Sequence, residues 1–271
     1  GSEMCIRDRR KALAQVPEHA IPGLAERDEQ DWVWLAQDDP LLDDPLLERF
    51  SATSLIVERM KQAMMLSGPQ FLGIQESKSI LSWLEHNQPE LVQELQRIMP
   101  LSRFSAVLQR LAGEGVPLRA VRLIVESLIE YGQHEREPDA LADYARIALK
   151  AQIFHQYSEA DGLHAWLLSP QTENVLRESL RQTQTGVFFA LDNDSSASLI
   201  NLLNQAFVAR PKSKSVMLVA QDLRSPLRTL LLEEFNHVPV MSFAELGSTS
   251  KVKVLGRFDL GQTDLMRGTA A

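Results

Sequence analysis

Residues 99–132 read MPLSRFSAVLQRLAGEGVPLRAVRLIVESLIEYG, and the other predicted elements are arranged around them. The first half carries an apolar helical stripe, formed by Leu101, Phe104, Val107, Leu108 and Leu111. The second half carries another, formed by Leu118, Val121, Ile124, Val125, Leu128 and Ile129. Between them Gly113 and Gly115 can take positive φ and end the first helix, while Pro117 suits the start of the second. We therefore predict two amphipathic helices joined by a tight turn.

Helical patterns flank this pair on both sides. Residues 53–66 are predicted as a helix with Thr53 or Ser54 as its N-cap, and Gly68 and Pro69 follow as breakers. Further helices are predicted over residues 75–86, 89–97 and 139–156. Several prolines fall near the predicted helix starts, where proline is best tolerated. Residues 73–157 are therefore expected to form a helical, bundle-like subdomain.

The pattern changes after residue 162 to short runs rich in Val, Phe and Leu, which indicate strands. These runs are LHAWLLS (163–169), VFFAL (187–191), SVMLVA (215–220), VPVMSF (238–243) and KVKVLGR (251–257). Helices are expected between them over residues 170–181, 195–209 and 224–235, with Ser225 capping the last one ahead of Pro226. The acidic run before the second of these helices lacks the glycine of a calcium loop, so Asp192 is expected to be a capping residue. The alternation predicts an α/β subdomain with a mixed sheet.

The net charge of −8 is concentrated in one segment. Residues 26–48 contain nine acidic residues and one basic residue, which leaves 27 of each sign in the rest of the chain. The same segment contains Trp32, Trp34 and several leucines. The simpler interpretation, which we favour, is a small irregular subdomain with inward aromatic side chains and solvated acids. The alternative is a patch that captures a partner, because exposed aromatics supply binding energy and carboxylates steer basic surfaces.

Composition excludes several classes of protein. No apolar run reaches the roughly 18 residues of a membrane helix, and the N-terminal residues lack the apolar core of a signal peptide. The single cysteine, Cys5, excludes a disulfide framework and a thiolate metal site, which fits a reducing cytoplasm. We expect the initial Gly-Ser to be a cloning remnant and set residues 1–10 aside as an unrelated leader. The helical pair resembles a DNA-binding helix–turn–helix, but an acidic chain with only Arg119 and Arg122 on the second helix argues against nucleic acid.

Motifs for catalysis or cofactor binding are missing from the sequence. There is no dinucleotide, P-loop, nucleophile-elbow or HExxH pattern. His155 and His164 are the only histidines close in sequence, and we expect them at a helix end and in a strand rather than on a metal. We therefore predict no enzymatic activity, no cofactor and no metal. An α/β domain that binds or converts a small molecule stays open as an alternative, and loss of turnover on changing Asp192 or His164 would favour it.

The order of residues also carries a resemblance. VLQRLAGEGVPLRAVRLIVESL (107–128), GIQESKSILSWLEHNQPELVQEL (73–95), EPDALADYARIALKAQI (137–153) and VMLVAQDLRSPLRTLLLEEFNHVPVMSFAEL (216–246) follow one family in order and spacing. They resemble segments of the large export-gate family of type III secretion systems and bacterial flagella, the FHIPEP family. The resemblance runs from Ala12 to Arg257 and concerns the soluble C-terminal part of that family.

This resemblance implies an α+β fold with several subdomains and a set of boundaries. A leader (1–10) precedes an acidic second subdomain with a remnant of the first (11–52). The closing helix of the first subdomain (53–72), a helical third subdomain (73–157), an α/β fourth subdomain (158–260) and a tail (261–271) follow. Most of the first subdomain is expected to be absent here, and the membrane is expected to be reached only through an N-terminal region outside this chain.

The resemblance also implies a function. The family's soluble domain forms a nonameric ring at the cytoplasmic face of the inner membrane. It docks chaperone–effector and translocator complexes, gatekeeper and stalk proteins, and passes substrates to the export channel. Asp31, Trp34 and Thr53 match the family's DxxW and AT elements and, with Trp32, are the predicted partner-binding residues, although Ser54 stands where the family usually has histidine. Ring contacts are predicted on polar faces that include the residues Arg119, Arg122, Glu126 and Asp143. The diverged acidic segment favours an injectisome, with a flagellar export gate as the alternative.

Overall fold

The computed structural model describes part of the chain in detail. The described residues are 3–7, 21–22, 32–36, 38–40, 48–183, 186–208, 214–232, 235 and 238–260. The chain divides into two compact units, one made of residues 1–65 and 201–213 and the other of residues 66–200 and 214–271. Among the described residues, no helix combines the length and the apolar character needed to cross a bilayer.

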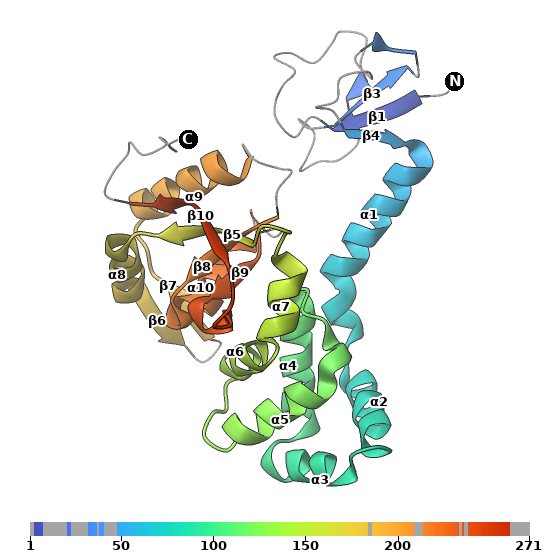
Figure 1. Cartoon of the computed structure of the whole chain (residues 1–271), viewed down its shortest axis with the longest axis vertical. Coiled ribbons are helices and arrows are strands. Elements are labelled where there is room, and N and C mark those ends of the chain that lie inside the picture. Colours follow the sequence, from blue (N-terminus) through green and yellow to red (C-terminus); the bar gives the residue numbers. More distant parts are fainter. Residues whose placement is uncertain are drawn as a thin grey trace. The chain divides into compact units, whose positions relative to one another are not determined.

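The first unit contains a four-stranded antiparallel sheet (Figure 1). Its strands are β1 (Glu3–Arg7), β2 (Ile21–Pro22), β3 (Trp32–Ala36) and β4 (Glu48–Ser51), in the order β2-β3-β1-β4. β1 pairs with both β3 and β4, with Cys5 opposite Trp34 and Phe50. Setting residues 1–10 aside was therefore wrong for residues 3–7. The partners of this five-residue strand lie more than 20 residues away, so a local pattern gives little sign of them.

Helix α1 (Ala52–Ser67) follows β4 directly. The hydroxyl of Ser51 accepts the backbone N–H of Ser54 at 3.1 Å, so Ser51 is the N-cap, and the predicted cap at Thr53 or Ser54 was wrong. The cap falls earlier than predicted because helical backbone begins at Ala52. A short 3₁₀ turn, η2 (Gly68–Phe71), follows at the predicted breakers.

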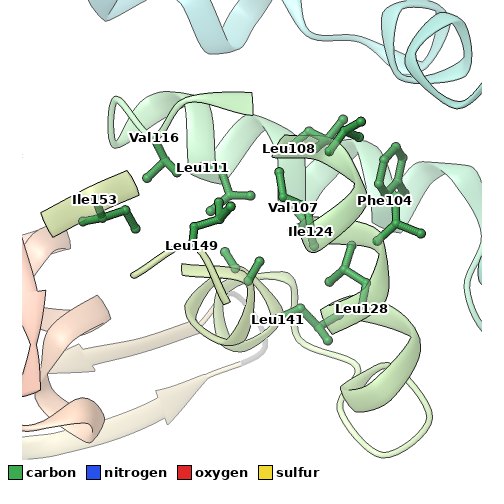
Figure 2. Close-up of a cluster of buried hydrophobic side chains, with 14 of the residues drawn as sticks. Phe104, Val107, Leu108, Leu111, Val116, Ile124, Leu128, Leu141, Leu149 and Ile153 are labelled. Atoms are coloured by element: carbon green, nitrogen blue, oxygen red, sulfur yellow. The ribbon is translucent and has the colours of Figure 1, made fainter. Parts of the chain in front are cut away.

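The helical part of the second unit agrees with the sequence pattern. Its elements are α2 (Ile74–Glu85), α3 (Pro89–Ile98), α4 (Leu101–Gly113), η3 (Leu118–Ala120), α5 (Val121–Tyr131), α6 (Pro138–Ala148) and α7 (Lys150–Tyr157). The predicted single helix over 139–156 is two helices, because the backbone bends at Leu149 (φ −92°, ψ 11°). Figure 2 shows that the bend leaves both Leu149 and Ile153 in the apolar cluster.

The predicted stripes of the helical pair form the centre of this core. Phe104, Val107, Leu108, Leu111, Ile124 and Leu128 are all at most 1% exposed (Figure 2). Leu163, Ala165, Val216, Leu218 and Met241 from the α/β part belong to the same cluster. The helical and α/β parts therefore share one hydrophobic core.

The α/β part is built on a parallel sheet (Figure 1). Its strands β5 (Leu163–Leu168), β8 (Ser215–Val219), β9 (Val240–Ser242) and β10 (Val252–Phe258) lie in the order β10-β5-β8-β9, and all their pairings are parallel. The helices are α8 (Pro170–Ser179), α9 (Asn193–Val208) and α10 (Gln221–Leu231), with the 3₁₀ turn η4 (Phe243–Glu245). Antiparallel pairing occurs in a separate hairpin, β6 (Leu180–Thr183) with β7 (Gly186–Phe189). The predicted α+β fold class is confirmed, but the predicted mixed sheet was wrong, because every pairing in the four-stranded sheet is parallel and the antiparallel pair lies outside it.

Three local expectations have different outcomes. Asp192 accepts the backbone N–H of Ser195 at 2.7 Å, which confirms its capping role. The helix predicted over 170–181 ends at Ser179, because residues 180–183 pair with β7 instead. Ser225 does not begin a helix: α10 starts at Gln221 and Pro226 lies inside it, one turn further on, where its missing N–H removes a single helical bond.

Candidate functional site

The turn after α4 directs one carboxylate into the protein. Gly115 has φ +70°, and the N–H groups of Gly115 and Val116 donate to the carbonyls of Ala112 and Leu111, each at 2.9 Å. This is a Schellman cap, with Val116 buried behind it. Gly115 therefore confirms the predicted turn, whereas Gly113 is the last residue of α4 rather than a residue with positive φ. The cap holds Glu114 with its side chain only 6% exposed.

Glu114 is the centre of a buried ion network. Arg224 Nη1 donates to Glu114 Oε2 at 2.5 Å and its Nη2 donates to Oε1 at 3.2 Å, so the pair is bidentate. Arg146 Nη1 donates to the same Oε2 at 2.9 Å, and Arg110 Nε lies 3.2 Å from Oε1. Burial alone would raise the pKa of Glu114, but the charges of Arg224, Arg146 and Arg110 outweigh it and lower the pKa to about 2.

Two further buried carboxylates, Asp143 and Glu245, belong to the network. Arg224 Nη2 also pairs with Asp143 on α6, and Arg146 Nη2 donates to Glu245 Oε2 at 2.7 Å. The other oxygen of Glu245 accepts the backbone N–H of Ser242 at 3.0 Å, which ties it to the end of β9. Burial raises the pKa of Asp143 to about 6, because it outweighs the charge of Arg224.

The network joins the helical and α/β parts of the second unit. Arg146, from α6, reaches Glu245 in η4, and Arg224, from α10, reaches Glu114 after α4. Arg110 of α4 also donates to the hydroxyls of Ser225 and Thr229 on α10, at 3.1 and 3.2 Å. The side chains of Arg146 and Arg224 are 2% and 0% exposed, so these two guanidinium groups cannot contact a partner directly. Its chemical role is to fix one part against the other.

The predicted ring residues fall into two groups. Arg119 is exposed in η3, and Arg122 Nε donates to Glu126 Oε1 at 2.7 Å in an exposed pair on α5. Asp143 does not lie on a polar outer face as expected; it is 8% exposed and paired with Arg224. The expectation of a solvated face was wrong for this residue because its position on α6 faces the buried guanidinium group.

The predicted partner-binding residues are described only in part. Thr53 is exposed in the first turn of α1. Trp32 and Trp34 belong to β3, but their side chains lie outside the description, as does the whole of Asp31.

Glu114, Arg146, Arg224 and Glu245 were not predicted as a site. A signal for three of them was present in the sequence. Each is a charged residue inside one of the quoted apolar motifs, in the segments EGVP, ARIAL and DLRSPL. A charge among buried positions indicates a paired, buried group.

One group of possible metal ligands lies close together among the described residues. Oxygen and nitrogen atoms of Glu159, Asp161 and His164 lie within 4.8 Å of one another. His164 Nε2 and Asp161 Oδ2 are 3.0 Å apart, and Lys253 Nζ donates to the same oxygen at 3.2 Å. As predicted, His155 lies near the end of α7 and His164 lies in β5. The Lys253 ammonium group already neutralises this carboxylate.

Comparison with known proteins places these features in a wider group. Residues 7–251 match the FHIPEP family. The hypersensitivity response secretion protein HrpI of Pseudomonas syringae pv. syringae is 59% identical over 241 residues, covering 89% of this chain and 34% of that protein. The chain thus spans about a third of the length of that relative.

Two solved structures share the architecture. The nonameric SctV-C of EPEC, solved by cryo-EM, has a TM-score of 0.76 and 29% identity, covering 95% of this chain and 78% of that one. The Chlamydia pneumoniae CdsV and CdsO complex has a TM-score of 0.73 and 27% identity, covering 90% and 75% of the two chains. The sequence resemblance noted above is confirmed by these matches.

Proposed function

Because the chain belongs to the FHIPEP family of type III secretion export gates, which are not enzymes, we propose that it is a ring-forming platform of an injectisome export gate. The observation that carries this proposal is the likeness to a nonameric SctV-C over 95% of the chain. A relative named for hypersensitivity response secretion supports an injectisome over a flagellar counterpart. The ring would lie at the cytoplasmic face of the inner membrane, below the export channel.

We place the ring contacts on the outward polar face of η3 and α5. Arg119, Arg122 and Glu126 are the described residues of this face. The Arg122–Glu126 pair is exposed, so it contributes little to the stability of one protomer and its groups can exchange partners between copies. Asp143 supports this face only indirectly, through the buried network.

We place cargo docking on the acidic segment and the adjoining start of α1. Asp31, Trp32, Trp34 and Thr53 are its proposed contacts for chaperone–effector, translocator and gatekeeper complexes, because aromatics next to carboxylates suit a partner with basic and apolar surface. A stalk protein is a further proposed partner, and the complex of the similar protein CdsV with CdsO supports binding of a second protein by this domain. Substrates released from chaperones would then pass to the membrane channel.

Sedimentation velocity of the whole chain over a range of concentrations tests the ring. We expect a concentration-dependent species larger than a trimer, which is lost in Arg119→Glu/Arg122→Glu. The matched control is Lys150→Glu/Lys251→Glu, which changes the same net charge at two exposed lysines and should leave assembly unchanged. A wild-type chain that remains monomeric at every concentration, or a control that disrupts assembly equally, contradicts the proposal.

Docking is tested by co-elution with a purified chaperone–effector complex from the same organism. We expect binding by the wild-type chain and loss of binding in Trp34→Ala with Asp31→Ala. Binding that is unchanged in this variant would remove the acidic segment from the docking site.

A further inference from the structure

A polar cavity of about 270 Å³ lies where three helices meet at their ends (α3, α4 and α5 in Figure 1). Its lining residues are Arg97, Ile98, Arg103, Gly132, Gln133 and Arg136, which we call the arginine pocket. Three of the six carry guanidinium groups and none carries a carboxylate. The pocket is therefore strongly cationic, although the chain as a whole has a net charge of −8.

Two of the three guanidinium groups lack an acidic partner in the described part of the chain. Arg97 Nη1 donates to Glu94 at 3.1 Å in an exposed pair on α3. Within the described residues, Arg103 and Arg136 have no carboxylate within 4 Å. Glu135 is adjacent in sequence, but its Oε1 already accepts the backbone N–H groups of Arg136 and Glu137, at 2.6 and 2.8 Å. The pocket thus has positive charge available for an anionic ligand.

The position of Arg103 and the close packing around Gly132 support an anion-binding role for the pocket. Arg103 lies in the first turn of α4, which contains no acidic residue, and the helix dipole disfavours a cation there unless an anion is bound nearby. Gly132 lines the pocket where the chain approaches its own backbone closely. A Cβ on Gly132 would collide with the backbone oxygen of Leu128 and lie 2.8 Å from Met99 Cε, so only glycine fits here without movement. The cavity is a formed feature of the α3–α4 corner.

We propose that the arginine pocket binds the acidic segment, residues 26–48, of a second copy of this chain. That segment holds nine acidic residues against one basic residue, including the pair Asp43-Asp44, and is the source of the chain's whole net charge. Guanidinium groups bind carboxylates through two parallel hydrogen bonds, which makes an arginine-lined pocket selective for such a segment. The inference rests on the proposed ring, which brings copies side by side.

Binding of a synthetic peptide of residues 26–48 tests the pocket without any ring. The receptor is the whole chain with Asp43→Lys/Asp44→Lys, so that its own segment does not compete. We expect fluorescence anisotropy to show salt-sensitive binding that weakens about tenfold or more when Arg103→Glu/Arg136→Glu is added. The matched control, Lys150→Glu/Lys251→Glu, changes the charge equally and should alter affinity less than about twofold, because neither residue lines the pocket or belongs to the proposed ring contacts. Absence of binding, or an equal loss in the control, overturns the proposal.

Charge exchange in trans tests the second copy as the occupant. The pocket variant (Arg103→Glu/Arg136→Glu) and the segment variant (Asp43→Lys/Asp44→Lys) should each self-associate less than wild type, and their mixture should regain association in sedimentation velocity. Circular dichroism checks that each variant folds. If Arg103→Glu/Arg136→Glu does not fold, Arg103→Gln/Arg136→Gln takes its place. If both variants assemble like wild type, this inference fails while the proposed ring stands. If wild type does not assemble but the peptide binds, the ring fails and the second copy is excluded as the occupant.

Discussion

Replacing Glu114 by glutamine is the most direct test of the buried network. The substitution keeps the size of the side chain and removes the charge that Arg146 and Arg224 share. The lowering of the Glu114 pKa from its ordinary 4.5 to about 2 corresponds to about 3 kcal/mol at neutral pH, at about 1.4 kcal/mol per pKa unit. Breaking a buried ion pair costs about 3–5 kcal/mol by the same reasoning from desolvation. We therefore expect Glu114→Gln to lose about 3–5 kcal/mol.

Urea unfolding followed by circular dichroism at pH 7 measures this loss. The matched control is Glu126→Gln, which removes a carboxylate from an exposed Arg pair and should cost less than about 1 kcal/mol. Because the folded pKa of Glu114 is lowered, its contribution is complete above about pH 4.5 and is lost as the pH falls toward 2. The difference between wild type and Glu114→Gln should shrink over that interval.

Two results would refute the reasoning. A loss of less than about 1 kcal/mol would mean that water or other groups compensate the two guanidinium groups. A loss that does not depend on pH between 4.5 and 2 would mean that Glu114 stabilises the protein by packing rather than by charge.

Further predictions concern the same unit. Asp143→Asn should remove the part of the pH dependence of unfolding that Asp143 contributes between about pH 4 and 6. The pKa of Asp143 is raised to about 6 in the folded state, which therefore holds the proton more tightly than the unfolded state. The free energy of unfolding contributed by Asp143 thus rises as the pH falls through 6, and urea midpoints of wild type and variant across this range measure the difference. Gly115→Ala should cost about 1 kcal/mol in urea unfolding, because φ is +70° and the added Cβ has room. Gly256→Ala should cost about 1–3 kcal/mol and change the near-ultraviolet spectrum, because its Cβ would lie 2.5 Å from the Trp166 ring, which stacks on Phe258. An unchanged spectrum would contradict that contact.

Much of the fold could be predicted where local pattern and burial agree. The helical pair was predicted from two stripes, and those stripes form the observed core. The β5 and β8 strands were predicted from continuous apolar runs, which suit strands buried on both faces of a parallel sheet. In these segments the local preference and the tertiary environment favour the same structure.

The failures arose where tertiary partners decide the structure. β1 exists because β3 and β4 pair with it, and its own five residues carry no helix or strand period long enough to show this. The helical pattern continues on both sides of Leu149, so the sequence does not show the bend there. The bend becomes visible only in the structure, where Ile153 is buried in the core. Asp143 was predicted on a polar outer face, and Arg146 and Arg224 were not predicted as part of a site, because charged residues are mostly exposed and a sequence does not show which charges are paired.

The buried network limits where the proposed platform can move. Separating the helical part from the α/β part would break the Glu114–Arg224 and Arg146–Glu245 pairs and expose a shared apolar core. Leaving one partner of such a buried pair unpaired costs about 3–5 kcal/mol of folding free energy. We therefore expect these two parts to move as one rigid body. A cargo that binds the acidic segment therefore cannot act by opening this junction. Exposed features such as the arginine pocket do not carry this cost, because two of its guanidinium groups have no carboxylate partner among the described residues that binding would have to displace.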